Sequence, residues 1–416
     1  MNNSLSFLIA WRYAWHKEKD SQISLMIKLC FAGIAIGTFA LMLTLIITNG
    51  FEKVISEKMR GINADLIISS PEGGKLDFQA IAQTLKHEMP TRIKEVGAQT
   101  IRQALLSQKK DQSVLFLKGV DAATEGTVST LAQKIIKSVL KSTMSPQQTI
   151  ASLLRPGNVL IGHKLASDHG LRVGQTMEIL IPEATSKRNI VLEKHKVTIA
   201  GMFKVGLEEF DTNLVFMPLT DLNELFEEEG SDFVTIRLQN DDERFLLESL
   251  GLLRNRLSHL EIRSWQELYP ALVASLKLEK YVMFFILALI TLVACMNMIS
   301  LLFMQIQNKR HDIAILRSMG CSNRDLQIIF LLLGICITAS ASLVGLSLAA
   351  LAGFFLERYP FIHLPDVYYV SHLPARMEPT IFVVVFVVTL LLGFLASWIP
   401  TRKAQKMDIL QILRQG

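Results

Sequence analysis

Residues 308–320 read NKRHDIAILRSMG, a polar and basic stretch that lies between two long apolar segments. Residues 281–306 before it and residues 326–356 after it contain no charged side chain. Each apolar segment exceeds the about 20 residues that a membrane-spanning helix requires. The pattern therefore predicts two spans joined by a short amphipathic basic helix, a layout through which a transporter receives force from a cytoplasmic motor.

Two further segments qualify as spans, because residues 29–48 and 380–400 are also free of charge. The whole chain is 50% hydrophobic and only 19% charged, below the roughly 25% charge of soluble domains. The first segment is longer than the apolar region of a signal peptide, usually about 7–15 residues, and it ends without a small-residue cleavage pattern. We therefore expect a retained anchor and four spans in all.

The basic residues near the ends of the spans predict the orientation, since lysine and arginine favour the cytoplasmic side. If there are four spans, all three basic flanks fall on one side, so both termini and residues 307–325 are expected in the cytoplasm. These basic residues do not gather with aromatic stacking partners, so nucleic acid is not an expected partner. The three groups are Arg12, Lys17, Lys19 and Lys28, then Lys309, Arg310, Arg317 and Arg324, and finally Arg402, Lys403, Lys406 and Arg414.

The stretch from residue 51 to residue 280 has no apolar run of spanning length and is long enough for one or two domains. It mixes strand and helix patterns, which predicts an α+β domain with subregions at 51–155 and 156–265. Its two ends, 51–60 and 268–280, are expected to continue the first two spans as a helical stalk. The expected strands are 64–69, 114–120, 159–162, 175–181, 196–203, 214–217 and 233–238, and the expected helices are 78–86, 127–142 and 163–169.

The expected fold is a membrane protein with four transmembrane α-helices and a large α+β periplasmic domain between the first and the second. The predicted boundaries are 1–22 for a cytoplasmic amphipathic N-terminal segment, 23–50 for transmembrane helix 1, 51–280 for the periplasmic domain with helical stalk ends, 281–306 for transmembrane helix 2, 307–325 for the cytoplasmic coupling segment, 326–356 for transmembrane helix 3, 357–378 for a short periplasmic connection, 379–400 for transmembrane helix 4 and 401–416 for a cytoplasmic tail.

Residues 182–196 form a polar insertion between two expected strands. It is longer than the about 2–5 residues of a hairpin loop. A loop that projects from a rigid scaffold is a candidate docking element, and the alternative is a flexible surface loop without a partner. The candidate docking residues are Glu183, Lys187, Arg188, Ile190 and Leu192.

Motifs for chemistry are missing from the sequence. It contains no phosphate-binding loop of the form G-x-x-x-x-G-K-[ST], and residues 73–75 have glycines and a lysine at the wrong spacing. H-E-x-x-H and G-x-S-x-G are absent too, and the cysteines show no metal-ligand spacing. We expect no catalytic residue, no metal and no cofactor in this chain. The spans also lack the ionisable residues of an ion pathway, and their Phe, Leu, Ile and Met side chains suit an apolar or amphiphilic cargo such as lipid.

Several motifs together resemble a known family. Residues 312–320 (DIAILRSMG) are similar to the coupling segment of FtsX-like permeases in MacB-like, type VII ABC transporters. The remaining motifs are similar to lipoprotein-releasing permeases of the LolC/LolE family, and the resemblance covers essentially the whole chain. These motifs are 49–52 (NGFE), 265–268 (WQEL), 276–280 (LKLEK), 368–374 (YYVSHLP) and 396–404 (ASWIPTRKA).

The resemblance implies a non-catalytic permease subunit in the inner membrane of a Gram-negative bacterium. Such a complex extracts lipoproteins and hands them to a periplasmic, LolA-like carrier. A separate LolD-like ABC ATPase dimer in the cytoplasm would bind ATP and Mg, and a second permease subunit, a paralogue or a copy, would complete the complex. Residues 182–196 correspond to a carrier-binding hook, which is short here and lacks an internal proline. A LolC-type, a LolE-type and a single-permease role therefore all stay open.

The resemblance also implies where the partners bind. Residues 308–320 would contact the ATPase, and the acyl chains of the cargo would enter near the first two spans. Two other functions remain as alternatives: an FtsX-like mechanotransmitter that regulates cell-wall hydrolases, and a MacB-like efflux permease. The expected ATPase-coupling residues are Asp312, Ile313, Leu316, Arg317, Met319 and Gly320, and the expected lipoprotein or lipid contacts are Leu43, Ile46, Ile47, Phe51, Phe284 and Leu287.

Overall fold

The computed structural model describes residues 21–108, 111–139, 145–186, 189–240, 242–359 and 372–404. The expected N-terminal segment up to residue 20, the end of the C-terminal tail and most of the 357–378 connection lie outside these residues. The chain divides into two compact units. The helical unit contains α2 as far as Glu52, α11 from Ala274 and the helices that follow, and the α+β domain spans Lys53–Val273.

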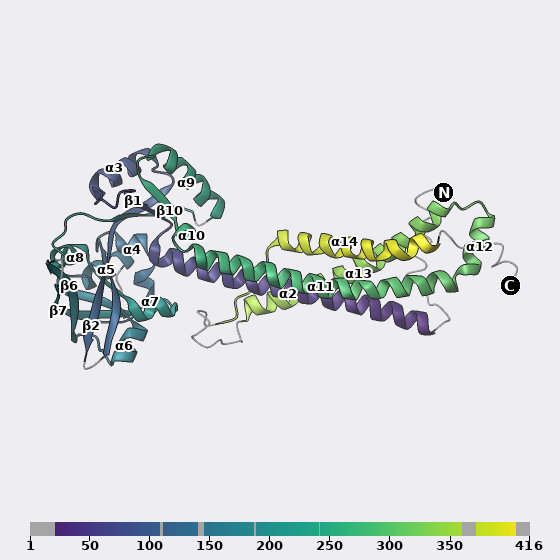
Figure 1. Ribbon diagram of the computed structural model, residues 1–416, viewed down its shortest axis with the longest axis horizontal. Helices are drawn as coiled ribbons and strands as arrows, with labels where there is room; N and C mark the ends of the chain where they lie inside the picture. Colours follow the sequence, from purple (N-terminus) through teal and green to yellow (C-terminus); the bar gives the residue numbers. More distant parts are fainter. Residues whose placement is uncertain are drawn as a thin grey trace. The chain divides into compact units, whose positions relative to one another are not determined.

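Long apolar helices build the helical unit (Figure 1). Four of the described helices are long and apolar enough to cross a membrane, and a short helix, α12, lies between α11 and α13 in the chain. The helices α2 and α11 each run without a break past the ends of the apolar segments. The bounds are α2 Ser21–Asn63, α11 Pro270–Asn308, α12 Arg310–Ser318, α13 Asn323–Arg358 and α14 Pro379–Ala404.

Small residues bring these helices close together. A Cβ added to Gly334 of α13 would lie 2.0 Å from Ser397 Oγ of α14, and one added to Gly345 of α13 would lie 2.4 Å from the Ala35 carbonyl oxygen of α2. Small residues at such crossings let helix backbones approach in an apolar solvent, where the hydrophobic effect gives helices no reason to associate. The Ala, Ser and Gly content of α13 therefore serves helix packing.

The α+β domain is built on one mixed sheet in the order β10-β1-β9-β2-β3-β8-β5-β7-β4, with β6 paired to β2 and β7. The pairs β3–β8 and β5–β7 are parallel, and the other pairs are antiparallel. The strands are β1 Leu66–Ser69, β2 Ile93–Gln108, β3 Asp111–Val120, β4 Ile135–Ser138, β5 Asn158–Gly162, β6 Thr176–Ser186, β7 Asn189–Phe203, β8 Leu214–Pro218, β9 Phe233–Leu238 and β10 Glu261–Ser264.

Helices and one 3₁₀ turn connect and cover the strands. The predicted helix at 163–169 is confirmed as α6, which ends at Gly170 in the left-handed conformation with a φ of 64°. The predicted helix at 127–142 is wrong, because this segment divides into the end of α4, the 3₁₀ turn η1 and strand β4. The bounds are α3 Phe78–Glu88, α4 Glu125–Val128, η1 Leu131–Lys134, α5 Pro146–Leu153, α7 Glu208–Asn213, α8 Leu219–Leu225, α9 Glu243–Arg256 and α10 Trp265–Leu268.

Two of the hydrophobic cores that the described residues form lie in this domain, and they do not match the expected subregions 51–155 and 156–265. One core combines Leu66, Ile68 and Val96 near the start of the domain with Ile236 and other residues near its end. The other core extends from residue 104 to residue 222. Strand β2 contributes to both cores, so the chain leaves the first core and returns to it after completing the second.

The C-terminal end of α2 is buried in the α+β domain, and a different element binds each of three consecutive carbonyl groups in its last turn. Arg237 of β9 donates to the Arg60 oxygen at 3.2 Å, the Thr130 amide donates to the Gly61 oxygen at 2.8 Å, and Lys118 of β3 donates to the Ile62 oxygen at 2.7 Å. The last carbonyls of a helix have no partner within the helix, so these bonds allow the helix to end inside the protein.

Lys118 is the unusual member of this set, since only 2% of it is exposed. Burial lowers the pKa of its ammonium group, and the nearby carboxylate of Glu125 acts in the opposite direction. Burial likewise raises the pKa of Glu125, a shift that Lys118 opposes. A buried cation is tolerated only where hydrogen bonds and an opposite charge replace its water, and the Ile62 carbonyl and Glu125 meet this requirement.

We predict that Lys118→Met lowers the free energy of unfolding by about 3–5 kcal/mol, because it leaves the Glu125 carboxyl and the Ile62 carbonyl buried without their cation. Thermal unfolding of the purified chain in detergent measures the effect. Lys94→Met is the matched control, since Lys94 is an exposed lysine of the same domain. Equal unfolding temperatures for the two variants would contradict the assigned role of Lys118.

Candidate functional site

Helix α12 confirms the expected amphipathic helix between two apolar helices, and one of its faces packs on its own chain. Ile313 and Ala314 are buried, and Ile313 belongs to a cluster that includes Leu302 of α11 and Leu326 of α13. The opposite face carries exposed apolar side chains: Ile315 is 44% exposed and Met319 is 79% exposed. A separate protein can therefore reach Ile315 and Met319.

Four of the expected coupling residues are engaged within the chain, and the prediction that Ile313 enters a groove of another protein needs correction. Ile313 is 3% exposed, so it cannot lie in a groove of another protein in this conformation. Leu316 is half-buried against the same cluster. The Arg317 guanidinium donates to the side-chain oxygen of Asn323 at the start of α13. Asp312 lies 3.8 Å from the Lys309 ammonium.

Gly320 ends α12. The Cys321 amide donates to the Leu316 carbonyl and the Gly320 amide donates to the Arg317 carbonyl, both at 3.0 Å. This pair of bonds is the Schellman motif, which needs a residue in the left-handed conformation, and Gly320 has a φ of 94°. Ser322 and Asp325 then form a capping box that begins α13. The turn that follows α12 is thus defined by backbone geometry, and this explains the glycine in the motif.

The expected lipid-contacting residues do not share one environment. Ile46 is fully buried and packs against Gly353 of α13, which excludes it from a lipid-facing surface in this structure. Phe284 and Leu287 are half-buried and pack against the apolar cluster that contains Ile46. The remaining three, Leu43, Ile47 and Phe51, are also half-buried.

Helix α11 has the most exposed apolar surface of the four long helices. In an apolar stretch of 18 residues in α11, 17% of the residues are buried. In the corresponding stretches of the other helices the buried share is 50% for α2 and for α13 and 28% for α14. Its exposed large apolar residues are Leu278, Tyr281, Val282, Met283, Phe285, Ile286, Leu289, Ile290, Val293 and Met296. A surface of this kind requires lipid or another apolar partner.

The segment that precedes α14 docks on α2 at the NGFE motif. The Arg376 amide donates to the Ile46 carbonyl at 3.1 Å, and a Cβ on Gly50 would lie 2.5 Å from the Pro374 carbonyl oxygen. Any larger residue at position 50 would separate these two backbones. Two residues after Gly50, Glu52 forms an ion pair of 3.0 Å with Lys280 of α11. The motif therefore joins three parts of the helical unit.

The predicted loop at 182–196 is wrong. Strands β6 and β7 pair from Thr176 with Thr198 to Ser186 with Asn189, with one register shift between Ala184 and Ser186. The described part of this stretch is therefore the distal half of a long hairpin. Lys187 and Arg188 lie outside the described residues, as do the side chains of Glu183 and Ile190. Leu192 is 41% exposed. Among the residues that the structure covers, no group of His, Cys, Asp and Glu could hold a metal ion.

Comparison with known proteins identifies the family. Residues 29–246, more than half of the chain, match the MacB-like periplasmic core domain, and residues 284–409 match the FtsX-like permease C-terminal domain. The chain belongs to the MacB-like, FtsX-like permease family that contains LolC and LolE.

Relatives of this permease align with it from end to end. The lipoprotein-releasing system transmembrane protein LolC of Xylella fastidiosa is 28% identical over 429 residues, which cover 100% of both chains. LolC of Neisseria meningitidis is 25% identical, with 99% of each chain covered. LolE of Haemophilus influenzae is 24% identical, with 98% of each chain covered.

A buried amide in this LolC/LolE-family permease was not expected from its sequence. Gln305 of α11 is 1% exposed, and neither polar atom of its side chain has a hydrogen-bond partner in the part of the chain that the structure describes. It follows Leu301 and Leu302 by one helical turn, and both of these belong to the cluster that holds Ile313 of α12. A buried polar group without a partner costs about 1–3 kcal/mol, so Gln305 destabilises the packing of the helix end that precedes α12.

We predict that Gln305→Leu raises the free energy of unfolding by about 1–3 kcal/mol, because leucine removes the desolvated amide and retains most of its volume. The change in thermal unfolding temperature, measured in detergent, tests this prediction. Gln307→Leu is the control, since Gln307 is exposed on the same helix. A lower unfolding temperature for Gln305→Leu would mean that the amide is hydrogen-bonded in the folded protein.

Proposed function

We propose that the chain is the permease subunit of an ATP-driven complex that extracts lipoproteins from the bacterial inner membrane and hands them to a periplasmic carrier. This proposal is supported by the sequence similarity of the chain, over its full length, to LolC and LolE proteins of lipoprotein-releasing systems. The sequence contains no phosphate-binding loop, which supports a non-catalytic subunit that works with a separate ATPase.

In the proposed topology the four long helices cross the inner membrane and both termini are cytoplasmic. The α+β domain, between α2 and α11 in the chain, is then periplasmic. The four apolar helices support this arrangement, and so do the basic residues of the α12 region. Lys309, Arg310, Arg317 and Arg324 all lie in or beside the connection from α11 to α13, where the positive-inside rule assigns the cytoplasm.

The proposed contact with a LolD-like ATPase dimer uses the outward face of α12. Ile315 and Met319 are its exposed apolar side chains, and Asp312 lies on the same side of the helix, one turn before Ile315. Arg317 lies on the side of Ile313 and donates to Asn323. Because the other face of α12 packs on α11 and α13, a push on this short helix would be delivered to both long helices. The ATPase would bind ATP and Mg, and this chain would supply only the surface that receives the force.

The proposed cargo path follows α11 and α2. The exposed apolar side of α11 suits the lipid bilayer, a second permease subunit or the acyl chains of a lipoprotein. Leu43, Ile47, Phe51, Phe284 and Leu287 remain candidates for that path, and Ile46 does not. An ATP-driven step is required because each buried CH₂ of an acyl chain contributes about 0.8 kcal/mol to membrane anchoring.

The proposed docking element for a LolA-like carrier is the distal half of the β6–β7 hairpin. A hairpin arm is a stiffer support than a loop, since alternate residue pairs along it exchange backbone hydrogen bonds. The exposed Leu192 near its end supports a role in contact with a partner.

Depletion of the protein from its native cell tests the proposed function. Mature lipoproteins should then accumulate in the inner membrane, which fractionation of the two membranes measures. Restoring the wild-type gene should restore the distribution. Correct delivery of lipoproteins during depletion would reject the proposal and favour a mechanotransmitter or an efflux permease.

We predict that Met319→Glu fails to restore lipoprotein delivery in the depleted cell, because a carboxylate replaces the most exposed apolar side chain of α12 at the proposed contact with the ATPase. The ATPase should co-purify with this variant in reduced amount. Met319→Leu, which keeps the side chain apolar, is the matched control and should behave as the wild type. Normal delivery with Met319→Glu would exclude this face of α12 from coupling.

A further inference from the structure

The last long helix, α14, has two faces of different character. Its small residues pack on α13: a Cβ added to Gly393 would lie 2.3 Å from the hydroxyl oxygen of Thr338, and Ser397 is fully buried. The opposite face is an exposed stripe of bulky apolar side chains. They are three or four residues apart and therefore lie on one side of the helix. The stripe consists of Val384, Val387, Leu391, Leu395 and Trp398.

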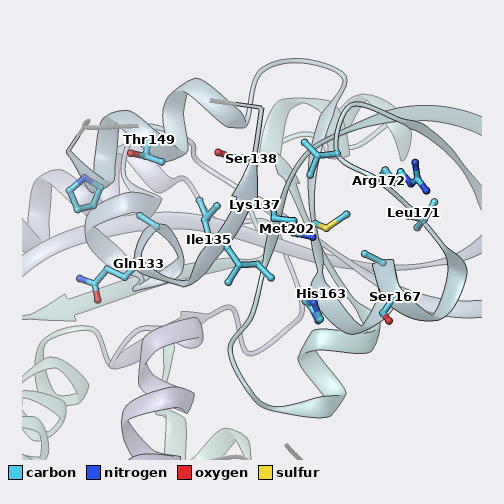
Figure 2. A pocket seen from close by; sticks show the side chains of 15 residues that line it. Gln133, Ile135, Lys137, Ser138, Thr149, His163, Ser167, Leu171, Arg172 and Met202 are labelled. Atoms are coloured by element: carbon cyan, nitrogen blue, oxygen red, sulfur yellow. The ribbon is translucent and has the colours of Figure 1, made fainter. Parts of the chain in front are cut away.

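The exposed surface of the α+β domain has a different composition. Figure 2 shows the side chains that line a cavity of about 1000 Å³ in that domain. Gln133, Thr149, His163, Ser167 and Arg172 among them are polar, as expected of a surface in contact with water. The stripe on α14, by comparison, has no polar group from residue 384 until the indole N–H of residue 398. The stripe is therefore not a surface that water solvates well.

The sizes of the side chains indicate which apolar partner the stripe fits. Helices that associate inside a membrane approach each other through small residues, and α14 has Gly393, Ala396 and Ser397 on its buried face. The stripe contains only valine, leucine and tryptophan. Bulky side chains keep a second helix backbone at a distance, whereas the flexible acyl chains of a lipid fill the spaces between them. The stripe thus fits lipid.

A tryptophan and an arginine lie together at the C-terminal end of the stripe. Trp398 is 38% exposed, and Arg402 follows it by one helical turn on the same side of α14. The guanidinium carbon of Arg402 is 5.0 Å from the centre of the indole ring, a cation–π distance. Arg402 is exposed and forms no ion pair with any residue that the structure describes. Its charge is therefore available to an anion outside the chain.

We propose that this face of α14 lies against the lipid bilayer and that Arg402 and Trp398 bind the headgroup of an anionic phospholipid at its end. The indole suits the level of the headgroups, because its ring is apolar and its N–H is polar. The guanidinium would donate to phosphate oxygens through its planar set of N–H groups, and the stripe would contact acyl chains. The inference concerns α14 alone and does not depend on the proposed lipoprotein cargo or ATPase.

Brominated phospholipids test the proposal on the full-length protein reconstituted in lipid vesicles. Bromine quenches tryptophan fluorescence on contact, and the signal of Trp398 is the difference between the wild type and Trp398→Phe. We expect bromine near the headgroup end of the acyl chain to quench Trp398 more strongly than bromine near the end of the chain. The reverse order would place the indole in the bilayer centre, and no quenching by either lipid would place it under another protein surface. Both results would overturn the proposal.

Mixed vesicles measure the headgroup preference beside Trp398. Brominated phosphatidylglycerol in unlabelled phosphatidylcholine is compared with the reverse mixture, and the quenching of Trp398 in the two gives the relative affinity. We expect phosphatidylglycerol to bind about fivefold more tightly, a factor that corresponds to about 1 kcal/mol.

Substitution of the arginine assigns the preference to Arg402. In Arg402→Gln the two lipids should bind equally, whereas the control Arg358→Gln, which removes an exposed arginine of α13, should retain the preference of the wild type. Each variant is compared with its own Trp398→Phe form, and unfolding temperatures check that both are folded. Equal binding of the two lipids by the wild type, a preference that survives in Arg402→Gln, or an equal loss in the control would each overturn the proposal.

Discussion

The last turn of α2 is the constraint on which much of the α+β domain depends. A helix that ends inside a protein leaves carbonyl groups without partners, and each must be satisfied by another element. Here Arg237, the Thr130 amide and Lys118 perform this role. The fully buried carboxylate of Asp65 accepts hydrogen bonds from the guanidinium groups of Arg60 and Arg237 and from the Leu238 amide. The need to bind one helix end thus explains a lysine in an apolar strand and an arginine in β9.

A second constraint acts at α12, a short helix that packs one face on its own chain and leaves the other face exposed. The Schellman turn at Gly320 and the capping box at Ser322 define where α12 ends and α13 begins. Ile313 is then buried, and Ile315 and Met319 are left exposed. The unpartnered amide of Gln305 lies in the helix that immediately precedes α12.

The sequence predicted the long helices well because their apolar runs exceed anything that a soluble domain needs. It also located most strands, since β-branched and aromatic runs are distinctive. The sequence did not predict the β6–β7 hairpin, because the polar residues of 183–196 have the composition of a loop. The two strands pair through backbone hydrogen bonds, which side-chain composition does not reveal. The false helix at 127–142 has a similar cause: the Thr130 amide is required by the Gly61 carbonyl, a long-range contact that no local pattern contains. The burial of Ile46 and Ile313 against other helices of the chain also depends on long-range contacts, so sequence composition could not predict it.

We propose that ATP hydrolysis by a partner, received at α12, releases a lipoprotein from the membrane. The most direct measurement reconstitutes the chain, its partner permease and its ATPase in lipid vesicles that contain an acylated lipoprotein, and follows transfer of the lipoprotein to a water-soluble carrier. Transfer should begin when ATP and Mg are added and should be absent with a non-hydrolysable nucleotide. Continuous ATP hydrolysis with no lipoprotein leaving the vesicles would contradict the claim.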